Sequence, residues 1–217
     1  MDLPAQRQAL VHCALALSRS GLSHGSSGNV SVRTKGGFII TPTGIGFEVL
    51  APEQLVELNQ EGAPNPGQWR PSSEWRFHRD LYRAQADVNA IVHVHSPYAT
   101  ALACARRAIP AFHYMVAAAG GDAIPCAPYA TFGTQALSDA IINTLNGRRA
   151  CLLAHHGSIA TGEDLQKASD LAQEVEFLAK VYVLTQQIGG GELLRVEEMR
   201  VVLEKFTRYG QQEQPVA

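Results

Sequence analysis

Histidine residues with the spacing of a metal site lie in the segment Ile91-Val92-His93-Val94-His95. Alternate side chains of a β-strand project from the same face, so the two imidazoles would share one face while Val92 and Val94 occupy the other. Two imidazoles on one face of a strand can chelate a single divalent metal without bending the backbone. The segment therefore predicts two ligands of one metal ion.

A third imidazole is available where a short apolar segment, residues 151–154, ends in His155-His156-Gly157. A lone buried histidine is usually a hydrogen-bonded core residue, but a His-x-His pair with a third candidate at the end of another strand favours a three-imidazole site. Three neutral nitrogen ligands suit zinc and leave coordination positions for substrate oxygens. The pattern alone leaves open which histidine of this pair is the ligand.

Glu74 follows two serines in Pro71-Ser72-Ser73-Glu74, which is the kind of sequence that begins a helix. A carboxylate beside a metal site is a candidate general base. Alternatively, Glu74 is an acid favoured in a first helical turn, and Ser72 and Ser73 only cap that helix. Serine hydroxyls and free N–H groups at a helix start are also what a phosphate group needs. His78, four residues later, fits core packing or a supporting hydrogen bond better than metal ligation.

The elements that must position these residues follow from apolar periodicity and from glycine and proline positions. The sequence predicts helices over residues 5–20, 97–107, 133–145, 165–187 and 196–206, and another that begins after Pro71. It predicts strands over residues 30–32, 38–41, 91–95 and 151–154, with a short helix and strand within residues 51–58. Strands mixed with helices on both sides indicate an α/β protein with a central, largely antiparallel sheet.

Length and composition limit the class of protein. A chain of 217 residues with 46% hydrophobic and 18% charged residues is an ordinary globular protein, and we expect one domain over residues 1–217. A net charge of −2 argues against nucleic acid as a partner. No apolar run reaches the roughly 18 residues that span a bilayer, and the N-terminus lacks a basic signal-peptide segment. The four cysteines lack Cys-x-x-Cys spacing, which favours reduced thiols in a cytoplasmic enzyme.

Five motifs together resemble the class II aldolase/adducin family. They are Gly28-Asn29-Val30-Ser31, Thr41-Pro42-Thr43-Gly44, Pro71-Ser72-Ser73-Glu74, His93-Val94-His95 and His155-His156-Gly157. Four longer segments, residues 71–78, 109–115, 117–121 and 124–134, resemble the members of that family that act on L-fuculose 1-phosphate. The resemblance extends from about residue 21 to residue 210.

The resemblance implies a three-layer α-β-α fold and a zinc enzyme. It implies reversible cleavage of L-fuculose 1-phosphate, a phosphorylated ketose, into dihydroxyacetone phosphate and L-lactaldehyde. The implied zinc ligands are His93, His95 and His156, the last because the family ligand directly precedes the glycine. Glu74 matches the acid/base residue and is a possible additional ligand when substrate is absent. The fragment left after cleavage is an enediolate, whose charge zinc would stabilise as a Lewis acid.

The resemblance also implies a phosphate-binding set and an assembly. The matching phosphate-binding positions are Gly28, Asn29, Thr43, Gly44, Ser72 and Ser73. Tyr114, contributed by a neighbouring subunit, and Tyr209, near the C-terminus, match residues that handle the aldehyde half, although either could be a packing aromatic. The implied assembly is a homotetramer with active sites between subunits. No nucleic-acid or membrane partner is expected.

Other functions remain open at this point. A ribulose-phosphate 4-epimerase shares the scaffold but has aspartate at the position of Glu74, which disfavours it. Another phosphorylated ketose or deoxyketose could be the substrate, because sequence alone does not rank close stereoisomers. An adducin-like head is a cytoskeletal binding module without the metal histidines, and the presence of His93, His95 and His156 disfavours that class.

Overall fold

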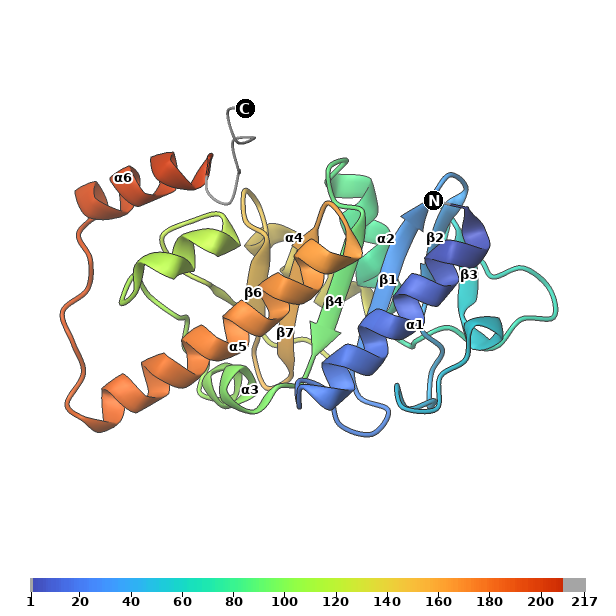
Figure 1. The fold of residues 1–217 in the computed structure, drawn as a ribbon, viewed down its shortest axis with the longest axis horizontal. Coiled ribbons are helices and arrows are strands. Elements are labelled where there is room, and N and C mark those ends of the chain that lie inside the picture. Colours follow the sequence, from blue (N-terminus) through green and yellow to red (C-terminus); the bar gives the residue numbers. More distant parts are fainter. Residues whose placement is uncertain (1, 209–217) are drawn as a thin grey trace, which may run out of the picture.

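A computed structural model describes residues 2–208 of the chain and is an α/β arrangement of three layers, with helices on both faces of one sheet (Figure 1). The helices and short 3₁₀ helices are α1 (Leu3–Arg19), η1 (Pro52–Gln54), α2 (Trp75–Ala84), α3 (Pro97–Cys104), η2 (Tyr114–Ala119), α4 (Gln135–Thr144), α5 (Leu165–Gln187) and α6 (Val196–Phe206). The strands are β1 (Asn29–Thr34), β2 (Gly37–Ile40), β3 (Val56–Asn59), β4 (Ala90–Val94), β5 (Cys126–Ala127), β6 (Ala150–Leu153) and β7 (Gly157–Gly162).

The seven strands of the described chain form a sheet of order β3-β2-β1-β4-β7-β6-β5. Every neighbouring pair is antiparallel except β5 and β6, which are parallel. The expectation of a mostly antiparallel central sheet is therefore confirmed. Strand β4, which carries the first candidate histidine, lies in the middle of the sheet with β1 on one side and β7 on the other.

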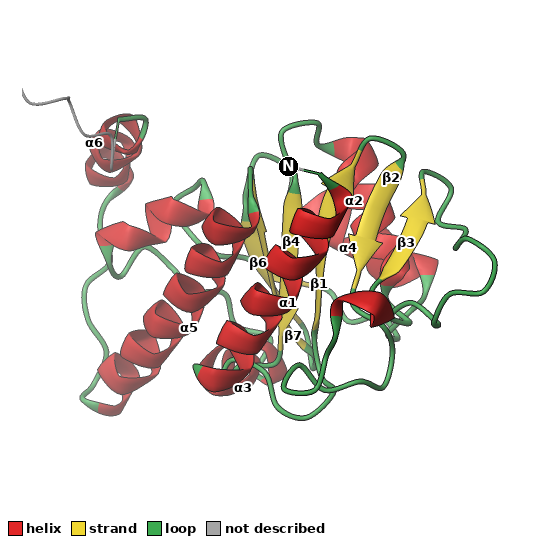
Figure 2. Ribbon diagram, turned by 45° about the vertical axis from the view of Figure 1, so that its right-hand side comes forward, coloured by secondary structure: helices red, strands yellow, loops and turns green. Residues whose placement is uncertain are grey.

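Two apolar cores lie on opposite faces of this sheet. Helices α1, α3 and α5 cover one face, and α2 and α4 cover the other (Figures 1 and 2). Strand β4 contributes to both cores, because Val92 and Val94 pack with α1, α3 and α5 whereas Ile91 packs with α2 and α4. Alternation along β4 therefore places His93 on the α2 side, where its ring contacts Phe77 at 5.7 Å between centroids.

Several predicted element boundaries were wrong. Helix α2 begins only at Trp75, so Glu74 is its N-cap residue and lies outside the first turn, and its side chain makes no capping hydrogen bond. Helix α3 ends at Cys104 rather than Arg107, because Arg106 takes a left-handed backbone conformation that a helix cannot continue. The carboxylate of Glu74 is thus free for contacts other than capping.

Strand β7 was missed by sequence reasoning. Its sequence Gly-Ser-Ile-Ala-Thr-Gly has glycine at both ends and only one large apolar residue, Ile159. All six residues are nonetheless buried, because β7 pairs with β4 and β6 and is covered by α5. Burial between two strands and a helix overrides the weak local strand signal.

Two further observations bear on the expectations from composition. All four cysteines are free thiols. Among residues 2–208, none of the helices combines the length and the apolar character that crossing a membrane requires.

Arg33 connects strand β1 to the end of α2 through hydrogen bonds. Its guanidinium donates to the carbonyl oxygens of Tyr82, Gln85 and Val88 at 2.8 to 2.9 Å. We expect Arg33→Ala to lower the free energy of unfolding by about 2–3 kcal/mol in urea denaturation, because three carbonyls lose a charged donor. Arg83→Ala is the control, since its ion pair with Glu61 is exposed and 3.9 Å long and should contribute less than about 1 kcal/mol. Equal losses in both variants would contradict this role of Arg33.

Candidate metal centre and active site

Three imidazoles converge at one end of the central strands. One ligand atom from each of His93, His95 and His156 lies within 4.8 Å of the others. The three ring centroids are 4.8, 4.8 and 4.9 Å apart, with interplanar angles of 73°, 74° and 68°. This arrangement is close to threefold, which is how three imidazoles surround a single ion.

Each of the three histidines is placed by the pairing of β4 with β7. His93 lies in β4, His95 follows the end of that strand, and His156 lies in the turn that joins β6 to β7. Because β4 and β7 run antiparallel, the end of β4 meets the start of β7, and the turn brings His156 to the pair. The two histidines that the sequence left open differ in position: His156 faces the other two rings, whereas His155 is exposed and accepts a hydrogen bond from Arg106.

A buried carboxylate lies against these imidazoles. Glu74 is 7% exposed, with Oε2 at 3.2 Å from His93 Nε2 and Oε1 at 3.4 Å from His156 Nε2. Burial by itself would raise the pKa of this carboxyl, but the neighbouring His93 and His156 and a hydrogen bond from Asn29 lower the pKa to about 2. Glu74 is therefore ionised at neutral pH, and its Oε1 is a buried oxygen without a hydrogen-bond partner in the described chain.

The donor set fits a divalent metal. Burial, with the adjacent His93, lowers the pKa of His95 to about 3 and that of His156 to about 4, so both imidazoles are neutral and can ligate at neutral pH. Nδ1 of His93 lies 2.9 Å from the carbonyl oxygen of Ser158, to which it can donate, and this directs Nε2 of His93 toward the other two rings. Three converging imidazoles and a carboxylate oxygen without a hydrogen-bond partner are ligands that suit a zinc-type ion.

A chain of buried hydrogen bonds holds Glu74 in place. Asn29 Nδ2 donates to Glu74 Oε2 at 2.9 Å, and the Asn29 amide oxygen accepts from His78 Nε2. His78 Nδ1 then accepts from the hydroxyl of Ser31, which contacts Tyr82 Oη at 2.7 Å. This sequence of donors and acceptors requires a neutral His78. Sequence reasoning had placed His78 in a supporting role, and its position agrees with that interpretation.

His95, His156 and Glu74 open onto a cavity of about 310 Å³. Of the candidate residues, those that line it are Gly28, Asn29, Thr43, Gly44, Ser72, Ser73, Glu74, His95 and His156. Gly28 is required there, because it has a φ of +83° and an added Cβ would lie 2.6 Å from the carbonyl oxygen of His93. Among the described residues, no lysine or arginine lines this cavity, so its polar wall consists of hydroxyl, amide and backbone groups.

Two aromatic residues of the cavity were missed as site residues. Tyr129 and Phe132 line it and are 56% and 65% exposed, which is unusual for large apolar side chains. They lie in the loop between β5 and α4, where no periodicity marks them. Their only signal was that residues 124–134 resembled family members.

The two candidate tyrosines do not join the site within the described chain. Tyr114 begins η2, is 46% exposed and stacks on His113, and it does not line the cavity. Tyr209 lies outside the described residues.

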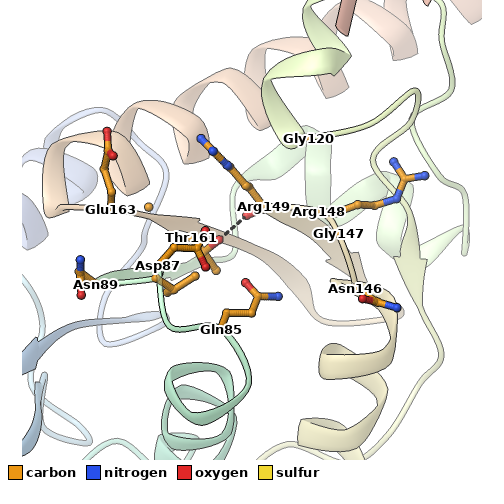
Figure 3. A pocket seen from close by; sticks show the side chains of 12 residues that line it. Gln85, Asp87, Asn89, Gly120, Asn146, Gly147, Arg148, Arg149, Thr161 and Glu163 are labelled. Carbon is orange, nitrogen blue, oxygen red and sulfur yellow. Dashed lines mark hydrogen bonds between the residues drawn. The ribbon is translucent and has the colours of Figure 1, made fainter. Parts of the chain in front are cut away.

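A second, larger cavity of about 720 Å³ lies at the opposite end of the central strands (Figure 3). It is surrounded by Asp87 and Glu163 and by Arg148 and Arg149, and the Thr161 hydroxyl there donates to the carbonyl oxygen of Arg149 at 3.1 Å. None of the candidate metal or phosphate residues lies in it. Chemistry rather than volume therefore identifies the site.

Comparison with known families assigns the chain. The family described as the class II aldolase and adducin N-terminal domain matches residues 8–183. The chain belongs to the class II aldolase and adducin family. The chain is accordingly an aldolase, a carbon–carbon lyase, and aldolases of this class are metal-dependent, which agrees with the three-histidine cluster.

Individual relatives within the class II aldolases are similar over nearly their whole length. The chain is 50% identical over 205 residues to the L-fuculose phosphate aldolase of Escherichia coli strain K12, covering 94% of each protein. It is 49% identical over 210 residues to the 5-methylthioribulose-1-phosphate/5-deoxyribulose-1-phosphate aldolase of Rhodospirillum rubrum, covering 95% of this chain and 93% of that protein. The solved structure of an L-fuculose 1-phosphate aldolase matches with a TM-score of 0.90 at 39% identity, covering 94% and 96%.

The buried His78 of this class II aldolase predicts a particular pH dependence. Burial and the nearby His93 lower the pKa of His78 from 6.5 to about 3, so the unfolded state binds a proton that the folded state excludes. Stability should therefore fall as the pH drops below 6.5, by about 1.4 kcal/mol per pH unit for this residue. We expect urea denaturation of metal-free protein between pH 6.5 and 5 to give a shallower dependence for His78→Gln. An unchanged slope in that variant would contradict the assignment.

Proposed function

We propose that this class II aldolase reversibly cleaves L-fuculose 1-phosphate into dihydroxyacetone phosphate and L-lactaldehyde with zinc as its metal. The proposal rests above all on one observation: three converging imidazoles and a buried ionised glutamate stand at one end of a cavity whose wall is made of neutral hydrogen-bond donors. The relatives of about 50% identity include enzymes named for this substrate.

His93, His95 and His156 would hold the metal, and Glu74 would join them when substrate is absent. Zinc bound there supplies Lewis-acid stabilisation of the negative charge that cleavage leaves on the ketose fragment. The neutral state of His95 and His156 means that these two ligands need not lose a proton when the ion binds.

Glu74 would move the proton at the carbon next to the carbonyl. With its pKa at about 2, this carboxyl is ionised at neutral pH, which is the form that accepts a proton. Asn29 keeps one carboxylate oxygen fixed, which leaves the other, Oε1, to exchange the proton. The same carboxyl returns the proton in the opposite direction of the reaction.

The phosphate group would bind to the donors of the cavity wall. Gly28, Asn29, Thr43, Gly44, Ser72 and Ser73 supply hydroxyl, amide and backbone N–H groups. Such donors fix the position of a phosphate without a charged partner. Binding energy obtained far from the reacting carbon would then orient that carbon toward Glu74.

We further propose a single domain over residues 1–217 that assembles as a homotetramer with active sites between subunits. The exposed position of Tyr114 supports a contribution of this residue to the site of a neighbouring subunit rather than its own. Tyr209 would act on the aldehyde half from the C-terminal segment.

A second candidate substrate is 5-methylthioribulose 1-phosphate or 5-deoxyribulose 1-phosphate. A relative named for both is 49% identical, nearly the same as the relatives named for L-fuculose phosphate. The exposed rings of Tyr129 and Phe132 suit an aldehyde with an apolar end, and the aldehydes from all three ketoses have one.

A substrate panel tests the proposed reaction. Purified protein, stripped with a chelator and reloaded with zinc, is given each of the three ketose 1-phosphates and also L-fuculose without phosphate. We expect the highest kcat/KM with L-fuculose 1-phosphate, loss of activity on chelation, recovery with zinc, and little cleavage of the free sugar. A higher kcat/KM for either ribulose derivative would replace the proposed substrate by the second candidate. Activity that survives chelation would contradict the metal.

Glu74→Gln tests the acid/base role. The variant keeps the shape of the side chain and removes its charge, so it should bind dihydroxyacetone phosphate but lose exchange of the carbon-bound proton by about 10²–10⁴-fold. Deuterium incorporation into dihydroxyacetone phosphate, followed by NMR without aldehyde, measures this step alone. Asp80→Asn is a matched control, because Asp80 is an acid on the outer part of α2 that bonds to Arg79 and Ser138. Wild-type exchange in Glu74→Gln would remove Glu74 from the mechanism.

A further inference from the structure

Two residues other than glycine have a left-handed backbone within residues 2–208, and they contact each other. They are Arg106, with φ 53°, and His155, with φ 55°. Arg106 lies in the loop after α3 and His155 in the turn between β6 and β7, and Arg106 Nε donates to His155 Nε2 at 3.0 Å. Side chains with a Cβ rarely adopt this conformation, and it persists only where the surroundings impose it.

The surroundings of His155 impose its left-handed backbone conformation. Its backbone N–H donates to the carbonyl oxygen of Ala103 in α3 at 3.1 Å, so both its backbone and its ring are bound to the same end of that helix. The next N–H, that of His156, donates to the carbonyl oxygen of Leu153 at 3.0 Å and closes the turn. The edge of the Tyr129 ring lies against His155, with 6.0 Å between the ring centroids.

His156 depends on this turn for its position more than His93 depends on any single neighbouring contact. His93 is part of a central strand, and its ring bonds to the carbonyl oxygen of Ser158. Within the described chain, the only polar contact of the His156 ring is with Glu74. Gly157 follows directly, and an added Cβ there would lie 2.4 Å from the carbonyl oxygen of Val94, so the chain has no freedom on that side. The direction of the His156 ring is consequently set by the backbone at His155.

We propose that Arg106 and His155 are positioning residues that aim His156 at the metal. The hydrogen bond between their side chains holds the left-handed turn, and the turn directs the third imidazole toward His93 and His95. This inference rests on the proposed metal site but concerns residues that do not bind the metal themselves. Residues that orient metal ligands typically change metal affinity by about 10–100-fold when they are removed.

The test measures zinc affinity by competition with a chromophoric chelator, independently of activity. Arg106→Asn removes the guanidinium but tolerates the left-handed backbone, so it isolates the side-chain contact. We expect its zinc dissociation constant to rise about tenfold. Arg107→Ala is the matched control, because Arg107 is the exposed neighbour in the same loop and should leave zinc affinity within about twofold of wild type.

A double-mutant cycle tests whether Arg106 changes zinc affinity through its hydrogen bond with His155. In a His155→Asn background the acceptor is already absent, so adding Arg106→Asn should change zinc affinity by less than about twofold. His155→Val, whose β-branched side chain opposes a left-handed backbone, should weaken zinc binding at least as much as Arg106→Asn does. Thermal unfolding of the metal-free variants distinguishes a loss of zinc affinity from a loss of overall stability.

The outcomes separate the inference from the proposed function. Wild-type protein that binds zinc no more tightly than His156→Ala would contradict the metal site itself. Tight binding by wild type together with unchanged binding by Arg106→Asn would overturn the positioning role and leave the metal site intact. An equal loss in Arg106→Asn and Arg107→Ala would also overturn it, because a general disturbance of the loop after α3 would then explain both.

Discussion

The antiparallel pairing of β4 with β1 and β7 brings together the three candidate metal histidines and Asn29. Asn29 is opposite His93 across the first pair, and Ile159 is opposite His93 across the second. The first pair places the amide that holds Glu74 beside the metal histidines. The second brings the β6–β7 turn, and His156 with it, to the end of β4. A shift of one residue in either register would reverse the faces and separate these groups.

Charge balance within this arrangement is a consequence of burial. A carboxylate that is 7% exposed normally becomes protonated, but Glu74 has imidazoles and an amide donor around it and stays ionised. His95 and His156 in turn stay neutral because burial opposes their protonation. A divalent cation complements both the ionised carboxylate and the converging ring nitrogens of this site. These side chains are costly to bury without an ion, and a bound cation would offset that cost by interacting with all of them.

Much of this could be predicted from the sequence, where local chemistry is distinctive. The His93-x-His95 alternation, a third imidazole from the His155-His156 pair and the mostly antiparallel sheet follow from strand geometry and residue type, whereas the preference for His156 came from the family resemblance. The start of α2 was misplaced because the serines before Glu74 look like a helix cap, although tertiary contacts determine the boundary. Strand β7 was missed because pairing on both sides, rather than side-chain propensity, makes it a strand. Tyr129 and Phe132 lie in a loop whose position depends on the whole fold, so neither spacing nor composition could place them at the cavity.

The absence of lysine and arginine from the cavity wall of the described chain couples the two ligands of the site. If a phosphorylated ketose binds here, as proposed, neutral donors would orient it but attract its charge only weakly, so a cation held by the histidines would supply most of the local attraction for the anion. Thermodynamic reciprocity then requires that substrate strengthen the retention of the metal by the same factor by which the metal strengthens the binding of substrate. Protein with substrate bound would therefore hold its ion more tightly than protein without substrate.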